Sequence, residues 1–310
     1  MALLLRLTPG CLRGSLSGLV LVGLLAPGVP AAADLQSAMR SFEAGDYSTA
    51  KMELEPLAES GEAEAQYLLG RLYDAGDGVS KDPGRAFPLF MQAAEQGHAE
   101  AQRVVGIYYE EGKAVGQSDI EAARWYEKAA DQGNDKAQRN FATALLLGRG
   151  TPASARRAAE YFQKAADQGN AKAMRNLAYL YYFGTGVRSD REQAAALFQK
   201  AAEAGVGKAD YDLARLYYRG HGVAKNEELA RELFQKAATD GHGKAQIFLG
   251  RMYMRGEGGP KDLKQAYFWL SVAAAQEPGD ADLLMKRARD QLNGNEIDEV
   301  DRKVAEFQPS

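Results

Sequence analysis

The chain has 310 residues, of which 45% are hydrophobic and 26% charged, a composition typical of a folded, water-soluble protein. Its net charge of −4 gives it no overall basic character, so nothing in the composition indicates nucleic-acid binding. Cys11 is the single cysteine, which excludes a disulfide within the chain.

Residues 1–33 have the pattern of a secretory signal peptide. Arg6 and Arg13 supply a basic start, GLVLVGLLAPGVP is a short apolar run, and three alanines end at Ala33. We therefore expect cleavage after Ala33 and a location in the periplasm of a Gram-negative bacterium or outside the cell. An uncleaved membrane anchor is the alternative, but prolines interrupt the run before the roughly 20 residues that a bilayer span needs. Because Cys11 precedes the apolar run, it does not fit a lipid-attachment site, and the mature chain is expected to have neither a cysteine nor a membrane span.

Residues 34–60 predict a shorter helical hairpin that caps the N-terminal end of the segments after it. Its turn is expected at Gly45. Asp46 is expected to begin the second helix because it lies one repeat period before Asp82, which has that role in the first of the repeats described next.

From residue 61 onward, one pattern recurs every 36 residues. Each copy opens with a glycine and has an alanine, a large apolar residue and a tyrosine or leucine at positions four, eight and twelve, which share one face of a helix. Position nine holds only glycine or alanine, which lets a neighbouring helix approach closely. The copies are expected at residues 61–96, 97–132, 133–168, 169–204, 205–240 and 241–277.

A second helix is predicted in each copy. Glycine stands at position fifteen of all six copies and suits the left-handed residue that ends a helix. Position twenty-one holds good N-cap residues: Asp82, Ser118, Ser154, Asp190, Asn226 and Asp262. Each copy therefore predicts a helix, a glycine loop and a second helix, and Pro88 is expected to bend the second helix of its copy.

The repeat pattern ends near Glu277, where the opening glycine fails. Residues 278–310 contain two further segments with helical apolar spacing, ADLLMKRARDQL and EIDEVDRKVAEF. We expect both to be capping helices that cover the last apolar edge of the array.

The alanine column, the Leu-Gly/Ala pair before tyrosine, the GxGV loops and the AAxxG phrase resemble the Sel-one-like repeat, a relative of the tetratricopeptide repeat. One such hairpin cannot bury its apolar face alone, so hairpins stack on their neighbours. The resemblance implies an all-α, right-handed α/α superhelical solenoid of helix-turn-helix repeats. Relatives in the bacterial envelope include periplasmic inhibitors of sensor kinases, polysaccharide-export scaffolds and virulence-associated adaptors, so it also implies a binding function.

Few residues suggest chemistry. The spacing of His98, His221 and His242 places no two of them with a carboxylate, so they are interpreted as exposed helix starts and a loop residue, with no metal and no cofactor. Ser48 to Lys51 match the S-x-x-K motif of β-lactamases, a described branch of the repeat family, but the Lys-Thr-Gly and Ser-Asp-Asn motifs are missing. We predict that the chain is not an enzyme, and a β-lactamase-like hydrolase is the second alternative.

One predicted face is rich in basic and aromatic side chains. By the tetratricopeptide resemblance, positions three, six, seven and ten of each first helix line a concave groove. Arginine and asparagine can hydrogen-bond carboxylates, and tyrosine offers flat contact area. The predicted partner-binding residues are Arg103, Lys136, Arg139, Asn140, Lys172, Arg175, Asn176, Tyr179, Lys208, Tyr211, Asp212, Arg215 and Arg251. The alternative is that these are ordinary exposed helix positions.

The sequence therefore predicts a non-catalytic protein-interaction scaffold or regulator of the bacterial cell envelope. Its partner is expected to be a protein or peptide of acidic character. A scaffold that binds or exports an envelope polysaccharide is the first alternative, because an anionic polysaccharide would also suit a basic, aromatic groove.

Overall fold

The structure is a computed structural model that describes residues 34–276 and 279–309. The predicted signal peptide, its cleavage site and Cys11 lie outside the described residues. Within the described part, every regular element is an α-helix, and the prediction of an all-α fold is confirmed. The helices are α1 (Leu35–Glu43), α2 (Tyr47–Glu59), α3 (Ala63–Ala75), α4 (Pro83–Glu95), α5 (Ala99–Glu111), α6 (Asp119–Asp131), α7 (Asp135–Leu147), α8 (Ala155–Asp167), α9 (Ala171–Phe183), α10 (Arg191–Glu203), α11 (Gly207–Arg219), α12 (Glu227–Thr239), α13 (Gly243–Arg255), α14 (Leu263–Gln276), α15 (Asp280–Arg289) and α16 (Gly294–Glu306).

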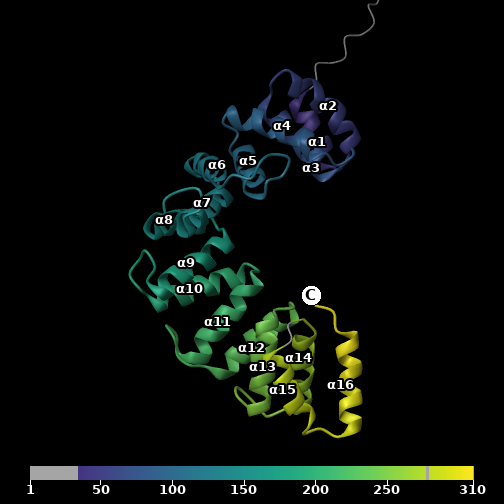
Figure 1. Cartoon of the computed structure of the whole chain (residues 1–310), viewed down its shortest axis with the longest axis vertical. Helices are drawn as coiled ribbons and strands as arrows, with labels where there is room; N and C mark the ends of the chain where they lie inside the picture. The colour runs from purple at the N-terminus through teal and green to yellow at the C-terminus, as the bar shows by residue number, and fades with distance from the viewer. Residues whose placement is uncertain (1–33, 277–278, 310) are drawn as a thin grey trace, which may run out of the picture.

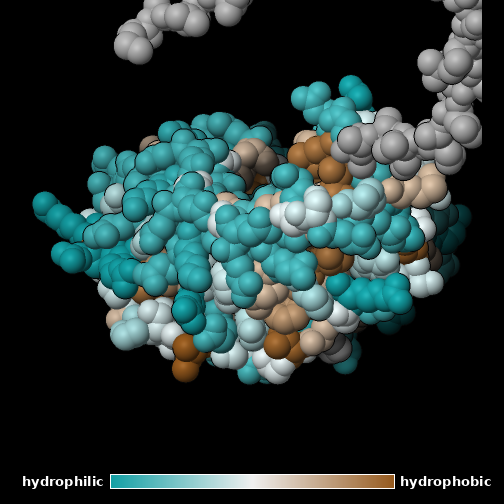
Figure 2. Space-filling model, turned by 90° about the horizontal axis from the view of Figure 1, so that it is seen from above, coloured by the Kyte–Doolittle hydropathy of each residue, from teal (hydrophilic) through white to brown (hydrophobic). Residues whose placement is uncertain are grey.

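Consecutive helices pack on one another from α1 to α15, and α16 packs back on α14. Figure 1 shows the hairpins following one another along an arc, with α5 and α7 on its inner side and α6 and α8 on its outer side. The face seen in Figure 2, which views the molecule from above relative to Figure 1, is mostly hydrophilic, with small separate apolar patches. None of the helices described combines the length and the apolar character that crossing a lipid bilayer requires.

Capping residues set the helix boundaries as the sequence predicts. In five repeats, the side chain at position twenty-one accepts a hydrogen bond from the N–H three residues further on. Asp262 accepts from the N–H groups of Lys264 and Gln265 in the sixth repeat. The six glycines at position fifteen have φ between 67 and 88°, the left-handed conformation that only glycine adopts without strain.

The two helix-start histidines differ from the sequence interpretation. His98 and His242 are half-buried N-caps whose Nδ1 atoms accept the N–H three residues further on. Their rings stack on Tyr67 and Tyr211, with 4.5 and 4.4 Å between ring centroids. Each histidine therefore caps its own helix and packs on a tyrosine of the preceding repeat, so neither is an exposed side chain.

In the three repeats that have glycine at position nine, this residue faces an aromatic or leucine side chain of the second helix. A Cβ atom added to Gly106 would lie 2.5 Å from the Tyr126 ring, and one added to Gly70 would lie 2.8 Å from the Phe90 ring. Real Cβ contacts are not that short, so the two helices of these hairpins can approach this closely only because the residue is glycine.

Buried glutamines connect successive repeats. Their side-chain amides donate to carbonyl oxygens of the preceding second helix at 3.0–3.2 Å. Three of them also accept a hydrogen bond, at 2.7–2.8 Å, from a glutamine thirty residues further on. The four buried residues are Gln66, Gln102, Gln138 and Gln246.

The fifth repeat breaks this pattern with two carboxylates. Asp210 and Asp240 stand where Gln66 and Gln96 stand in the first repeat. Asp210 is 1% exposed, and its Oδ1 accepts from Lys236 Nζ at 3.0 Å. Among the described residues its Oδ2 has no hydrogen-bond partner, and burial raises the pKa of this carboxyl. A buried polar atom without a partner lowers stability.

Two further helix pairs lie at the ends of the array. Between α1 and α2, Gly45 has φ 77°, and Asp46 accepts the N–H of Thr49 to cap α2. At the other end, Ala288 of α15 and Val300 of α16 share a buried cluster with residues of α14. These end helices cover apolar surface that the neighbouring hairpins would otherwise expose to water.

Candidate partner-binding groove

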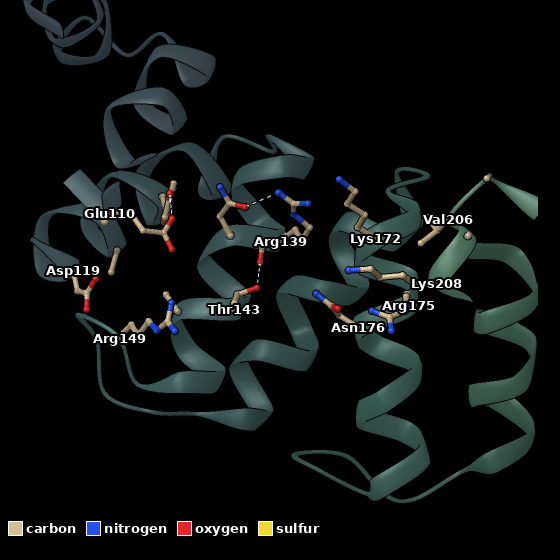
Figure 3. A pocket seen from close by; sticks show the side chains of 17 residues that line it. Glu110, Asp119, Arg139, Thr143, Arg149, Lys172, Arg175, Asn176, Val206 and Lys208 are labelled. Carbon is tan, nitrogen blue, oxygen red and sulfur yellow. Dashed lines mark hydrogen bonds between the residues drawn. The ribbon is translucent and has the colours of Figure 1, made fainter. Parts of the chain in front are cut away.

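A cavity of about 660 Å³ extends from the second repeat to the fifth and is lined by residues of α5, α6, α7, α9 and the start of α11. Six of the predicted site residues line it, and we call the cavity with these residues the basic groove: Arg139, Asn140, Lys172, Arg175, Asn176 and Lys208. Figure 3 shows Lys172, Arg175, Asn176 and Lys208 gathered at one end of the cavity, with Arg139 toward its middle. The structure therefore brings together side chains that lie one repeat period apart in the sequence.

Helix geometry places the lysines at one edge of the basic groove. Lys172 and Lys208 are the second residues of α9 and α11, and both are exposed. Arg139 is half-buried, and its Nη2 donates to Asn140 Oδ1 at 2.8 Å. Within the part of the chain that the structure describes, no carboxylate lies within 4.0 Å of the charged nitrogens of these three cations. Their charge is therefore available to an anion in the cavity.

Arg175 has a structural partner in addition to its place in the basic groove. Its Nε donates to Asp212 Oδ2 at 2.6 Å, and its Nη2 donates to the Tyr179 hydroxyl at 3.3 Å. The Tyr179 hydroxyl in turn donates to Asp212 Oδ1. Burial raises the pKa of Asp212, while Tyr179 and Arg175 act in the opposite direction. Arg175 thus neutralises a buried carboxylate, and only part of its guanidinium can serve a partner.

Two of the residues predicted to face the groove, Tyr211 and Asp212, are buried. Asp212 is 3% exposed and Tyr211 is 8% exposed. Asp212 stands at the position that holds Asn140 and Asn176 in the two preceding repeats, and it turns toward the cation of the preceding first helix. Tyr211 packs between the stacked ring of His242 and the apolar core.

A second, smaller cavity adjoins the basic groove, and we call it the aromatic notch. Its lining residues are Tyr179, Tyr182, Phe183, Phe198, Asp212, Arg215, Leu216 and Arg219. Three of the predicted residues, Tyr179, Asp212 and Arg215, lie in it. The Arg175–Asp212–Tyr179 hydrogen bonds join the two cavities.

Four of the predicted residues line neither cavity. Arg103 is bound to Glu100, with Nη2 to Oε1 at 2.6 Å, and the guanidinium of Arg251 lies 5.2 Å from the centre of the Phe248 ring. Lys136 is exposed at the start of α7, and Tyr211 is buried as described above.

Several lining residues were missed from the sequence. Glu110, Asp119, Thr143 and Arg149 also line the basic groove, and Figure 3 shows Glu110, Asp119 and Arg149 at the end away from Lys208. Thr143 occupies position ten and Phe183 position fourteen, which continue the helical stripe of positions three and seven. The helical spacing of these positions could have indicated Thr143 and Phe183 from the sequence. Arg149 lies in a glycine loop, where no periodic pattern indicates the direction of its side chain.

The structure describes the side chains considered for metal binding and for catalysis. No group of three or more His, Cys, Asp or Glu side chains among the described residues is arranged to hold a metal ion. Ser48 and Lys51 lie in the first turns of α2, where Lys51 Nζ pairs with Glu55 Oε1 at 2.9 Å.

Stacked helical hairpins with a groove across their first helices define the class of α-solenoid repeat proteins. The Sel1 repeat matches at residues 63–98, 99–134, 135–170, 171–206, 207–242 and 243–278, each two residues later than the predicted start of a copy. The chain belongs to the Sel1 repeat family, whose members are generally non-catalytic protein-interaction scaffolds.

Two solved structures have the same fold. A Sel1 repeat protein from Oxalobacter formigenes is 30% identical, with a TM-score of 0.72 over 79% of this chain and 98% of that one. The protein c5321, a protective antigen present in uropathogenic Escherichia coli strains, displays an SLR fold and is 28% identical. Its TM-score is 0.73 over 88% of this chain and 64% of that one. A comparison with curated protein sequences gives no match.

Proposed function

We propose that this chain is a non-catalytic scaffold or regulator of the bacterial cell envelope, and that its basic groove binds an acidic segment of a partner protein. The observation that carries the proposal is the gathering of Arg139, Lys172 and Lys208 in one cavity without carboxylate partners among the described residues. The chain as a whole is acidic, with a net charge of −4, so this concentration of cations is local. The end of the cavity with Lys172 and Lys208, away from Glu110 and Asp119, therefore carries positive charge that attracts a ligand of the opposite sign.

The position of the lysines supports binding over a structural role. Lys172 and Lys208 lie in the first turns of α9 and α11, at the positive end of the helix dipole. A cation there is disfavoured by about 0.3–1 kcal/mol. Since these lysines do not stabilise their helices, an anionic partner gives a reason for their presence.

The envelope location rests on the sequence of residues 1–33. Their basic start, apolar run and alanine triplet favour export through the cytoplasmic membrane. N-terminal sequencing of the mature protein is expected to begin at Asp34.

Reversing the two lysine charges tests the proposed groove. The variant Lys172→Glu with Lys208→Glu is expected to bind a labelled peptide of about twelve glutamates at least tenfold more weakly, because it removes two positive charges and adds two negative charges that repel the peptide. Its melting temperature should be unchanged or slightly higher, since glutamate is favoured at a helix N-terminus. Fluorescence anisotropy at several salt concentrations measures the affinity, which should fall as salt rises in the unsubstituted protein.

The matched control reverses two charges on second helices. Arg85 and Arg156 lie in the first turns of α4 and α8 and have exposed side chains. The variant Arg85→Glu with Arg156→Glu should keep the affinity of the unsubstituted protein. Equal losses in both variants would mean that only net charge matters, and failure of the unsubstituted protein to bind the peptide would reject an acidic partner.

A further inference from the structure

Two apolar side chains continue the groove-facing stripe by one turn. Leu147 and Phe183 are the last residues of α7 and α9, and they are 55% and 68% exposed. They follow Thr143 and Tyr179 by four residues, so each lies on the same helix face as a residue that lines the basic groove or the aromatic notch. Phe183 itself lines the notch. Exposed large apolar side chains that repeat on one face indicate a surface for binding.

The apolar pair lies at the opposite edge from the lysines. Every first helix crosses the groove in the same direction, because a second helix returns the chain between them. The N-terminal turns with Lys172 and Lys208 therefore form one edge, and the C-terminal turns with Leu147 and Phe183 form the other. From Lys172 to Phe183 the helix rises about 16 Å at 1.5 Å per residue.

This separation suits one α-helix lying across the first helices. A helix with its side chains is about 10–12 Å in diameter, and the flexible four-carbon stems of the lysines can extend over the rest of the distance, so one helix can contact both edges. The notch beside Phe183 offers it the apolar faces of Tyr179 and Tyr182, with Arg215 and Arg219 alongside. A ligand that makes favourable contacts with both edges carries carboxylates on one side and apolar side chains on the other.

We propose that the occupant of the basic groove is an amphipathic helix of a partner protein, with acidic residues toward Lys172 and Lys208 and apolar residues toward Leu147 and Phe183. The inference rests on the proposed function and adds the shape of the partner segment. Binding of this kind is a helix-in-groove interaction, in which apolar anchors at helical spacing give the specificity.

Synthetic peptides of about eighteen residues provide the test. The first has glutamates and leucines on opposite faces of a helix, and the second has the same composition in an order that gives no apolar face. The first should bind at least tenfold more tightly than the second. In the variant Leu147→Ser with Phe183→Ser, this difference should disappear, while binding of the all-glutamate peptide should stay within a factor of two or three.

The control variant is Met52→Ser with Leu283→Ser, which removes two exposed apolar residues of α2 and α15. It should bind both peptides as the unsubstituted protein does. Equal affinities for the two peptides, or a preference that survives Leu147→Ser with Phe183→Ser, would overturn the amphipathic-helix proposal even where the all-glutamate peptide still binds. Sedimentation that shows a dimer dissociated by the serine variant would identify the occupant as a second copy, which also overturns it.

Discussion

Replacing Arg175 with alanine is expected to lower the free energy of unfolding by about 2–4 kcal/mol. Asp212 is almost completely buried, and Arg175 is the cation that pairs with it. Removing one partner of a buried pair leaves an uncompensated charge, which costs about 3–5 kcal/mol when both groups are dry. The guanidinium of Arg175 is partly exposed, and Tyr179 would still donate to the carboxylate, so we expect a somewhat smaller loss.

Urea unfolding of Arg175→Ala, Asp212→Asn and the double variant measures this coupling directly. The asparagine in the double variant removes the buried charge, so it should recover a large part of the stability that Arg175→Ala loses. A loss below about 0.5 kcal/mol, or no recovery in the double variant, would mean that the pair does not hold these two helices together. Since Arg175 stabilises the fold, the binding tests depend on Lys172 and Lys208.

Replacing Asp210 and Asp240 with glutamine is expected to raise the free energy of unfolding by about 2 kcal/mol. The change restores the pair that Gln66 and Gln96 form in the first repeat, where the amide nitrogen of Gln96 lies 2.7 Å from the carbonyl oxygen of Gln66. It also removes the buried Oδ2 atom of Asp210 that has no partner among the described residues. Lys236 loses its contact, but its side chain is more than half exposed and can be solvated.

The stability gain of the double glutamine variant should depend on pH. Because burial raises the pKa of Asp210 in the folded protein, its contribution to stability is complete below the unfolded value of about 3.9 and is lost as the pH rises through the folded value. The double glutamine variant lacks this titration. Its advantage in melting temperature should be largest near pH 7 and should decrease below about pH 4. Glu160→Gln, at an exposed position of α8, is the control and should change little at either pH.

A destabilised double glutamine variant would show that the two carboxylates have a favourable arrangement in the fifth repeat. A stability gain that does not change with pH would show that Asp210 titrates normally. Either result would contradict the claim that the buried carboxylate of Asp210 lowers the stability of the fifth repeat.

Local hydrogen bonds made most of the fold predictable from the sequence. The N-cap at position twenty-one and the glycine at position fifteen act on backbone groups within a few residues, so the residue type alone indicates the helix end. Because six copies share the pattern, the apolar face on which the hairpins stack can be distinguished from a chance arrangement of residues. The places of Lys172 and Lys208 in the first turns of their helices were predictable as well, because the same local signals define where each helix begins.

Contacts between repeats were not predictable in this way. The partner of Arg175 lies 37 residues further along the chain, and an aspartate at that position is equally consistent with exposure to solvent. The stacking of His242 on Tyr211 and the buried pairs of glutamines likewise depend on how one hairpin sits on the next. These contacts determine which polar side chains of the stripe are buried and which remain available to a partner.

Site-specific photocrosslinking in cells is the most direct test that the basic groove binds the partner. A photoreactive residue at Lys172, at the edge of the groove, is compared with one at Arg156 on α8, which Figure 1 shows on the outer side of the arc. We expect a discrete crosslinked protein from position 172 and none from position 156, with the acidic segment of that protein carrying the crosslink. Crosslinks from position 156 without any from position 172 would place the partner on the outer surface and contradict the proposal that the basic groove binds it.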